Sequence, residues 1–149
     1  MLSNELFTIF NQIINESHEM VTAFVDKEDL TGKFDYASIY AQSKDEFGWV
    51  DEELRANGTT TDVWGKGHYY LLNEPIETSF GVVRKCTVWQ FDPETKERGY
   101  LDFEVSNYKS FKGKYISKPN FELISLPHVE LVELKAPNYT VRAYFPDGL

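Results

Sequence analysis

Two carboxylates on one expected strand are the residues of this sequence best placed for acid–base chemistry. Tyr100, Asp102 and Glu104 alternate with Leu101 and Phe103, so the three polar residues share one face of a strand. Carboxylates that face a cavity acquire shifted pKa values and can transfer protons, whereas carboxylates that face water are ordinary strand decoration. The spacing is compatible with both readings, and it designates no catalytic residue.

An aromatic pocket is the setting that such chemistry would need, and aromatic residues make up 15% of the chain. Ser17 interrupts the apolar stripe of an N-terminal helix. Such a serine usually bonds a backbone carbonyl one turn back or makes room for a bulky neighbour, and a polar pocket is the alternative. We expect a candidate pocket between this helix and a sheet, lined by Ser17, His68, Tyr70, Trp89, Tyr100, Asp102 and Glu104.

The sequence contains no recognisable metal or cofactor motif. His18, His68 and His128 do not fall at a metal-ligand spacing, and Cys86 is the only cysteine. The segment 65–67, Gly-Lys-Gly, is followed by strand-like residues and not by a helix, which favours a hairpin turn over a phosphate loop. We therefore expect no cofactor, no metal and a small, buried, unreactive thiol at Cys86.

The negative charge is concentrated in the first half of the chain. Residues 1–75 hold 14 acidic and five basic residues, whereas residues 76–149 hold ten of each. This distribution disfavours direct nucleic-acid binding by the first half, because phosphate contacts need cations. It would attract a basic partner protein. The alternative is that the acidic surface is solvated and only keeps the protein soluble. The expected partner-binding surface comprises Asp26, Glu28, Asp29, Asp45, Glu46, Asp51, Glu52 and Glu53.

Basic and aromatic residues interleave between Tyr108 and Phe121, among them Lys112 and Lys114. This mixture is typical of surfaces that bind single-stranded nucleic acid. The alternative is that these residues form a basic loop that lies against the acidic half of the same chain.

Apolar periodicity predicts an amphipathic helix from about Ser3 to Val25. Ser43 and Glu46 match a capping box, which opens a short second helix that ends at Asn57 and Gly58. The expected strands are Phe34–Gln42, Thr59–Trp64, His68–Asn73, Val82–Phe91, Tyr100–Ser106, Phe121–Ser125, Val129–Lys135 and Tyr139–Phe145.

Short turns between these strands indicate antiparallel pairing. We expect Val82–Phe91 and Tyr100–Ser106 to form a hairpin about Thr95, which would place Val88 and Cys86 opposite the two carboxylates. The fold class is therefore α+β: a single domain, 1–149, with a long N-terminal amphipathic helix and a short second helix on a curved, mostly antiparallel sheet of about six to eight strands.

No leader pattern and no apolar run of membrane-spanning length is visible, so we expect a cytoplasmic protein. The oligomeric state cannot be read from the sequence. The favoured function is a non-enzymatic binding protein that presents the acidic half to a basic partner, with an inhibitor of a nucleic-acid-handling enzyme as one form. The alternative is a small-molecule-binding protein or a hydrolase- or isomerase-type enzyme that uses the aromatic pocket.

Overall fold

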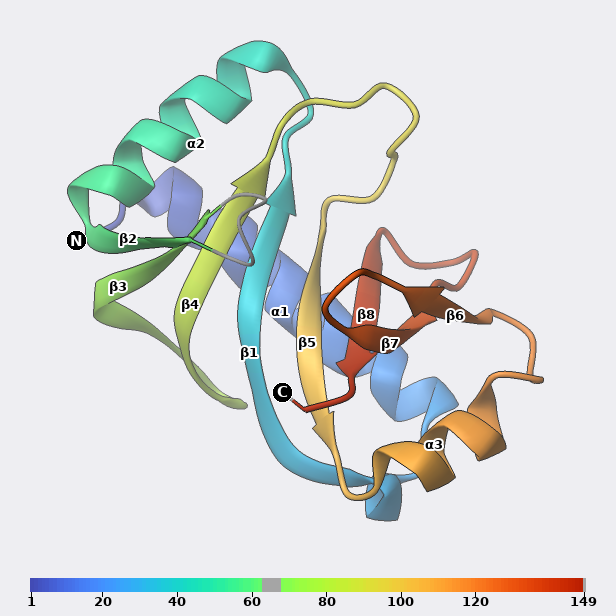
Figure 1. Cartoon of the computed structure of the whole chain (residues 1–149). Coiled ribbons are helices and arrows are strands. Elements are labelled where there is room, and N and C mark those ends of the chain that lie inside the picture. Colours follow the sequence, from blue (N-terminus) through green and yellow to red (C-terminus); the bar gives the residue numbers. More distant parts are fainter. Residues whose placement is uncertain (63–67, 149) are drawn as a thin grey trace.

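The computed structural model describes residues 1–62 and 68–148, which form three α-helices on one face of an eight-stranded sheet (Figure 1). The segment 65–67, expected as a hairpin turn, lies outside the described residues. The α+β fold expected from the sequence is confirmed, and the sheet does not close into a barrel.

Helix α1 (Asn4–Phe24) runs behind the sheet along the length of the molecule. Ser3 caps it, because the Ser3 hydroxyl accepts a hydrogen bond from the backbone N–H of Leu6 at 3.2 Å. The apolar stripe is buried against the sheet, and Thr8 and Glu19 on the opposite side are exposed. The expected orientation of this helix is therefore confirmed.

Helix α2 (Lys44–Ala56) begins at the predicted cap. The Ser43 hydroxyl accepts from the N–H of Glu46 at 3.0 Å, and Val50 and Leu54 are buried on the inner side of the helix. The helix packs on strands at one end of the sheet, so its outer side faces away from the core.

The eight strands are β1 (Leu30–Tyr40), β2 (Gly58–Asp62), β3 (His68–Thr78), β4 (Gly81–Trp89), β5 (Gly99–Val105), β6 (Phe121–Ser125), β7 (Glu130–Leu134) and β8 (Val141–Pro146). Their order across the sheet is β2-β3-β4-β1-β5-β8-β7-β6. Five of the seven neighbouring pairs are antiparallel, whereas β1–β4 and β5–β8 are parallel.

The expected hairpin between β4 and β5 is wrong, because β1 lies between these two strands. Asp102 consequently faces Asp35 on β1 and Tyr144 on β8, not Val88 or Cys86. A strand with alternating polar and apolar residues can pair with any neighbour that continues the same two faces, so the alternation alone does not select the partner.

A third helix, α3 (Tyr108–Tyr115), occupies a segment in which the sequence suggested a basic loop. Asn107 caps it by accepting from the N–H of Ser110 at 3.0 Å. Phe111 and Tyr115 lie one turn apart and are both buried, Phe111 against Phe145 of β8. A short 3₁₀ helix, η1 (Lys27–Asp29), joins α1 to β1.

The space between α1 and the sheet is filled by side chains. Leu6, Phe10, Ile13 and Ile14 of α1 have no exposed surface, and a Cβ at Gly99 of β5 would collide with Ile13. The expected pocket between helix and sheet is therefore occupied by the core in the described part of the chain. None of the described helices is long and apolar enough to cross a membrane.

Candidate functional site

Asp102 lies on the face of the sheet that is turned away from the three helices, which we call the open face. Its neighbours along β5, Leu101 and Phe103, point to the helices and are buried in the core. Oδ1 of Asp102 is itself buried and has no hydrogen-bond partner among the described residues. A buried carboxyl oxygen without a hydrogen-bond partner costs free energy of folding, so Asp102 is a candidate for a functional role.

Asp35 is the residue directly opposite Asp102 on the neighbouring antiparallel strand β1. Its Oδ1 accepts hydrogen bonds from the backbone N–H groups of Tyr36, Arg84 and Lys85, at 2.9, 3.2 and 3.1 Å. The Asp35 carboxylate thus joins β1 to β4 where the two backbones do not pair directly.

Burial and the adjacent Asp35 carboxylate raise the pKa of Asp102 well above its ordinary value. Asp102 therefore holds its proton more tightly than an ordinary aspartate, and it lies beside the Asp35 carboxylate, which already accepts three hydrogen bonds. A neutral carboxylic acid of this kind can donate a hydrogen bond or a proton to a group that reaches it.

Three tyrosines, Tyr40, Tyr100 and Tyr144, cluster beside Asp102 on the open face. The hydroxyls of Tyr40 and Tyr144 are 3.0 Å apart, and the ring centroids of Tyr100 and Tyr144 are 4.5 Å apart. The indole N–H of Trp89 donates to the Tyr100 hydroxyl at 3.2 Å, with the Trp89 side chain still exposed. Burial, followed by the neighbouring Tyr144, raises the pKa of Tyr40, so this hydroxyl stays protonated.

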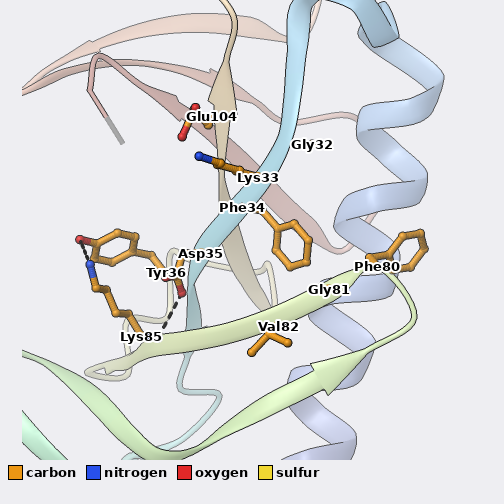
Figure 2. A pocket seen from close by; sticks show the side chains of 10 residues that line it. All are labelled: Gly32, Lys33, Phe34, Asp35, Tyr36, Phe80, Gly81, Val82, Lys85 and Glu104. Carbon is orange, nitrogen blue, oxygen red and sulfur yellow. Dashed lines mark hydrogen bonds between the residues drawn. The ribbon is translucent and has the colours of Figure 1, made fainter.

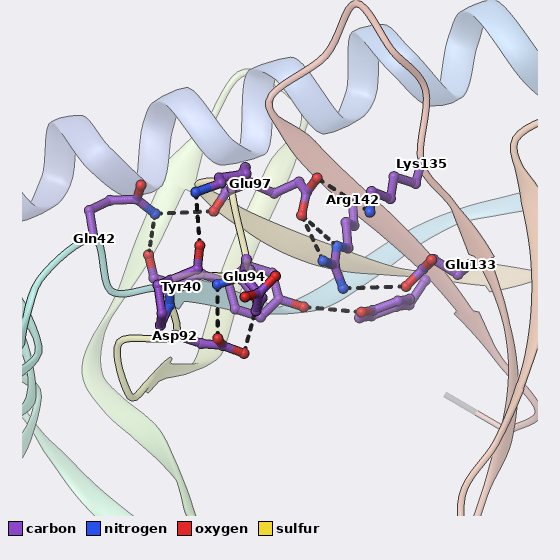
Figure 3. A network of polar contacts seen from close by, with 12 residues as sticks. Tyr40, Gln42, Asp92, Glu94, Glu97, Glu133, Lys135 and Arg142 are labelled. Carbon is purple, nitrogen blue, oxygen red and sulfur yellow. Dashed lines mark hydrogen bonds and ion pairs between the residues drawn. The ribbon is translucent and has the colours of Figure 1, made fainter.

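Arg142 connects this tyrosine cluster to a network of charges (Figure 3). Its guanidinium donates to Oε1 of Glu97 at 2.7 and 2.9 Å and lies 3.6 Å from Glu133. It also lies over the ring of Tyr40, 5.1 Å from the centroid. Burial alone would raise the pKa of Glu97, but the hydrogen bonds and charge of Arg142 hold it below its usual value. The network fixes the Gln90–Arg98 connection against the end of the sheet.

The sheet is split between β1 and β4. These parallel strands pair only from Ala37 and Cys86 onward, and they diverge on the N-terminal side of these two residues. Tyr36, at the point of divergence, has a φ of 59°, an uncommon backbone conformation for a residue other than glycine. The split opens into a hollow of about 390 Å³, lined by Gly32, Lys33, Phe34, Asp35, Tyr36, Phe80, Gly81, Val82, Lys85 and Glu104 (Figure 2).

The residues expected to line one pocket lie in different parts of the structure. Trp89, Tyr100 and Asp102 come together on the open face, and Glu104 borders the hollow in the split. Ser17 and Tyr70 instead belong to the core on the helix side. The side chain of His68 lies outside the described part of the structure.

Tyr70 and Ser17 differ in whether their buried hydroxyls have a hydrogen-bond partner. Tyr70 donates its hydroxyl to Asp51, and burial together with this bond raises the pKa of Tyr70 to about 12. Ser17 is buried, and its hydroxyl makes no hydrogen bond to the described residues, so the expected bond to a carbonyl one turn back is not formed.

Cys86 is a buried thiol whose pKa is raised by burial, followed by the charge of Asp35. Within the described residues, no group of three or more histidine, cysteine or acidic side chains is arranged to hold a metal ion.

The first acidic cluster (Asp26, Glu28 and Asp29) lies against α3. Nζ of Lys114 is 2.6 Å from Asp26 and 2.7 Å from Asp29, and the Tyr115 hydroxyl donates to Asp29 at 2.6 Å. The bonds from Lys114 and Tyr115 lower the pKa of Asp29. The alternative in which the basic segment contacts the acidic half is thus observed, through Lys114.

The second acidic cluster (Asp45, Glu46, Asp51, Glu52 and Glu53) lies on α2. Some of its carboxylates bind other residues of the fold, and others do not. Glu46 forms two hydrogen bonds with the Arg98 guanidinium, at 2.8 and 2.9 Å, and Glu53 accepts from Ser3. Asp51 pairs with Arg55 at 3.0 Å. The two others, Asp45 and Glu52, are exposed and form no ion pair with any described residue.

Several residues of the open face were not expected from the sequence: Asp35, Tyr36, Tyr40, Arg142 and Tyr144. The last two could have been found, since they alternate with buried Val141, Ala143 and Phe145 and must therefore share one face of β8. The pairing of Asp35 with Asp102 has no such signal, because it depends on β1 inserting between β4 and β5.

Comparison with known proteins shows similarity at the level of the fold alone. No family model and no curated protein matches the sequence. Among solved structures, the chain is similar to one described as "Structural Genomics, Protein EC4020", with a TM-score of 0.62 and 11% sequence identity. The similarity covers 97% of this chain and 92% of that chain. The two chains therefore share an overall fold over nearly their whole lengths, and at this identity function does not transfer with it.

Proposed function

We propose that this chain is a non-enzymatic binding protein that presents the outer side of α2 to a basic partner protein. The supporting observation is the position of Asp45 and Glu52. They lie seven residues apart, hence on the same side of the helix, and both are exposed without an ion pair to the described residues. These two residues are the acidic stripe of α2.

The division of the acidic residues supports this choice of surface. Asp26 and Asp29 share an ion pair with Lys114, and Glu46 pairs with Arg98, so these carboxylates already have partners within the fold. A partner would have to break these pairs before using them, whereas the acidic stripe is available. Free carboxylates on a rigid helix steer a cationic partner and raise the rate of association.

Enzymes that handle nucleic acid carry lysine and arginine in their phosphate-binding grooves. A helix with an acidic stripe can lie in such a groove and exclude the nucleic acid. Inhibition of an enzyme of this class is the form of binding that we propose.

The test compares two variants of equal net charge. Asp45→Asn with Glu52→Gln neutralises the acidic stripe, whereas Glu19→Gln with Glu122→Gln neutralises two exposed carboxylates on α1 and β6, far from α2. The native chain, immobilised at low ionic strength, should retain a basic protein from its host and release it as salt is raised.

Retention should fall for the α2 variant and not for its control, and added nucleic acid should compete for the retained enzyme. Equal retention by both variants, or no retained basic protein at any ionic strength, would contradict the proposal. In that case the acidity serves solubility alone.

A second candidate is the small-molecule-binding or enzymatic function, with its site on the open face. One observation favours it: Asp102 has a buried Oδ1 without a partner beside Tyr100 and the exposed Trp89. Ligands that engage this site should shift the NMR signal of the Trp89 indole N–H, and Asp102→Asn should weaken them. If a fragment library leaves that signal unmoved, this candidate fails.

A further inference from the structure

The split between β1 and β4 has two unpaired strand edges facing one another in the interior of a sheet. Pairing between these strands covers only Ala37–Tyr40 and Cys86–Trp89 in the described chain. The first half of β1 therefore pairs only with β5, and the first half of β4 only with β3. Backbone N–H and C=O groups on such edges are templates for another strand.

The inner floor of the split is apolar. Phe34 and Phe80 lie on the side of α1 (Figure 2). Both rings contact the ring of His18, at centroid distances of 4.5 and 4.0 Å. Phe34 is buried, whereas Phe80 is 49% exposed and Val82 is 42% exposed at the mouth of the split. Exposed apolar side chains beside a hollow mark a surface suited to a binding partner.

The outer rim of the split carries an excess of cations. Lys33 and Arg84 are exposed and form no ion pair with the described residues, and Lys85 is held over the Tyr36 ring. Glu104 and Asp35 are the carboxylates that line the hollow, and Asp35 is also bonded to three backbone N–H groups. Three cations against these two carboxylates leave an excess of one positive charge, which an acidic side chain entering here would meet.

From these features we infer that the split accepts an extended segment of a partner polypeptide, which adds a strand between β1 and β4. Its side chains alternate: apolar residues point inward to Phe34 and Phe80, and acidic residues point outward to Lys33 and Arg84. Backbone hydrogen bonds to the two edges supply affinity, and the alternating side chains supply specificity. The bonded Asp35 carboxylate closes the inner end of the split and fixes where the segment stops.

The length of the unpaired edge sets the length of the segment. Leu30 to Asp35 of β1 lie ahead of the pairing with β4, but a bulge at Gly32 shortens this stretch, because it runs alongside only Val105 to Asp102 of β5. The edge is therefore roughly 10 Å long at the rise of a β-strand, which suits about three to four paired residues of the segment. This site is separate from the acidic stripe of α2, and its occupant has the opposite charge.

The test uses the full chain and a displayed library of random peptides of about eight residues, long enough to span the split. Enriched sequences should alternate apolar and acidic residues and lack proline, because proline cannot donate to a strand ladder. A synthetic peptide of an enriched sequence should shift the amide NMR signals of residues 31–35 and 82–84.

Matched variants decide where the peptide binds. Lys33→Glu should weaken it roughly tenfold, because it turns attraction on the rim into repulsion. Lys109→Glu, which makes the same charge change at an exposed position of α3, should leave it unchanged. N-methylation of the peptide backbone at alternate residues should weaken binding by roughly fivefold per lost hydrogen bond.

Neutralising the acidic stripe of α2 should not alter peptide binding, so this site and the proposed function fail or succeed separately. The inference is overturned if no sequence is enriched, or if enriched peptides bind the Lys33→Glu and Lys109→Glu variants equally well. Either result would mean that Lys33 and the turn at Tyr36 only protect an edge from aggregation.

Discussion

Asp35 and Asp102 face one another across adjacent antiparallel strands, yet Oδ1 of Asp35 accepts three backbone hydrogen bonds, whereas the buried Oδ1 of Asp102 has no partner among the described residues. This asymmetry separates their behaviour. The Asp35 carboxylate is held by three backbone N–H groups, whereas burial of Asp102, followed by the charge of Asp35, raises the pKa of Asp102 well above its ordinary value.

The first prediction concerns Asp102 and pH. Because the folded chain binds this proton more tightly than the unfolded chain, the free energy of unfolding should decrease as pH rises above the unfolded value of about 3.9. Asp102→Asn, which keeps the shape and removes the titration, should flatten this decrease and raise the melting temperature at pH 8. Glu104→Gln, two residues along the same strand, is the control and should not. Parallel stability curves for the native chain and Asp102→Asn would show that Asp102 is ionised in the fold.

His18 should produce the opposite slope. Burial lowers its pKa to about 4, because the ring is enclosed by Phe34, Phe80 and Phe103. The unfolded chain binds this proton more tightly, so stability should be lost as pH falls from about 6.5 to 4. His18→Phe keeps a ring in the stack and should reduce that loss. His128→Phe, at an exposed site, should leave the acid limb of the stability curve unchanged.

The orientation of α1 can be checked by truncation. Phe10 has no exposed surface, and Phe10→Ala should cost about 3–5 kcal/mol of unfolding free energy through lost burial and a residual cavity. Thr8, on the outer side, bonds only the carbonyl of Asn4 in its own helix, so Thr8→Ala should change little. Urea unfolding of both variants measures the difference, and equal midpoints would contradict the orientation.

Features that depend on neighbours in sequence were predictable. The stripe from Leu6 to Val21 and the cap at Ser43 involve residues within a few turns of one another, and both appear in the structure. Helix α3 was missed although Asn107 caps it and Phe111 and Tyr115 are one turn apart. Glycine at 113 argued against a helix, but burial of these two rings outweighs its modest cost.

Features that depend on distant residues were not predictable. β4 and β5 follow one another in the sequence, and a local turn could join them as a hairpin. In the sheet, however, β1 lies between them. The partner of a strand is selected by packing of whole faces, which a single sequence does not display. The site follows the same rule: the sequence predicts Trp89, Tyr100 and Asp102 as pocket residues, whereas the position of Asp35 beside Asp102 depends on the strand order.

Cys86 should be inert in the folded protein. Its side chain is buried and its pKa is raised, so little thiolate forms near neutral pH and reagents cannot reach it. A thiol reagent should label the native chain much more slowly than the urea-unfolded chain. Cys86→Ser should keep partner binding. Rapid native labelling would show an exposed and activated thiolate instead.

The last prediction concerns the contact between η1 and α3. This contact determines whether Asp26 and Asp29 are engaged within the fold or are free to bind a partner. The Tyr115 hydroxyl donates to Asp29 and accepts from the backbone N–H of Asp26 at 2.9 Å, with the ring itself buried. Tyr115→Phe should cost about 1–3 kcal/mol, because it removes a hydrogen bond to a charged group and leaves a backbone donor without its acceptor.

Lys114 contacts the same carboxylates from an exposed position, where water and salt screen the attraction. Lys114→Met should therefore cost less than Tyr115→Phe, and its effect should shrink further at high salt, while that of Tyr115→Phe should persist. Urea unfolding at two ionic strengths distinguishes the two contributions. If Lys114→Met proves the more damaging, charge neutralisation and not the buried hydroxyl holds η1 on α3. If neither variant lowers stability, Asp26 and Asp29 are free for a partner, and the acidic surface is larger than the stripe on α2.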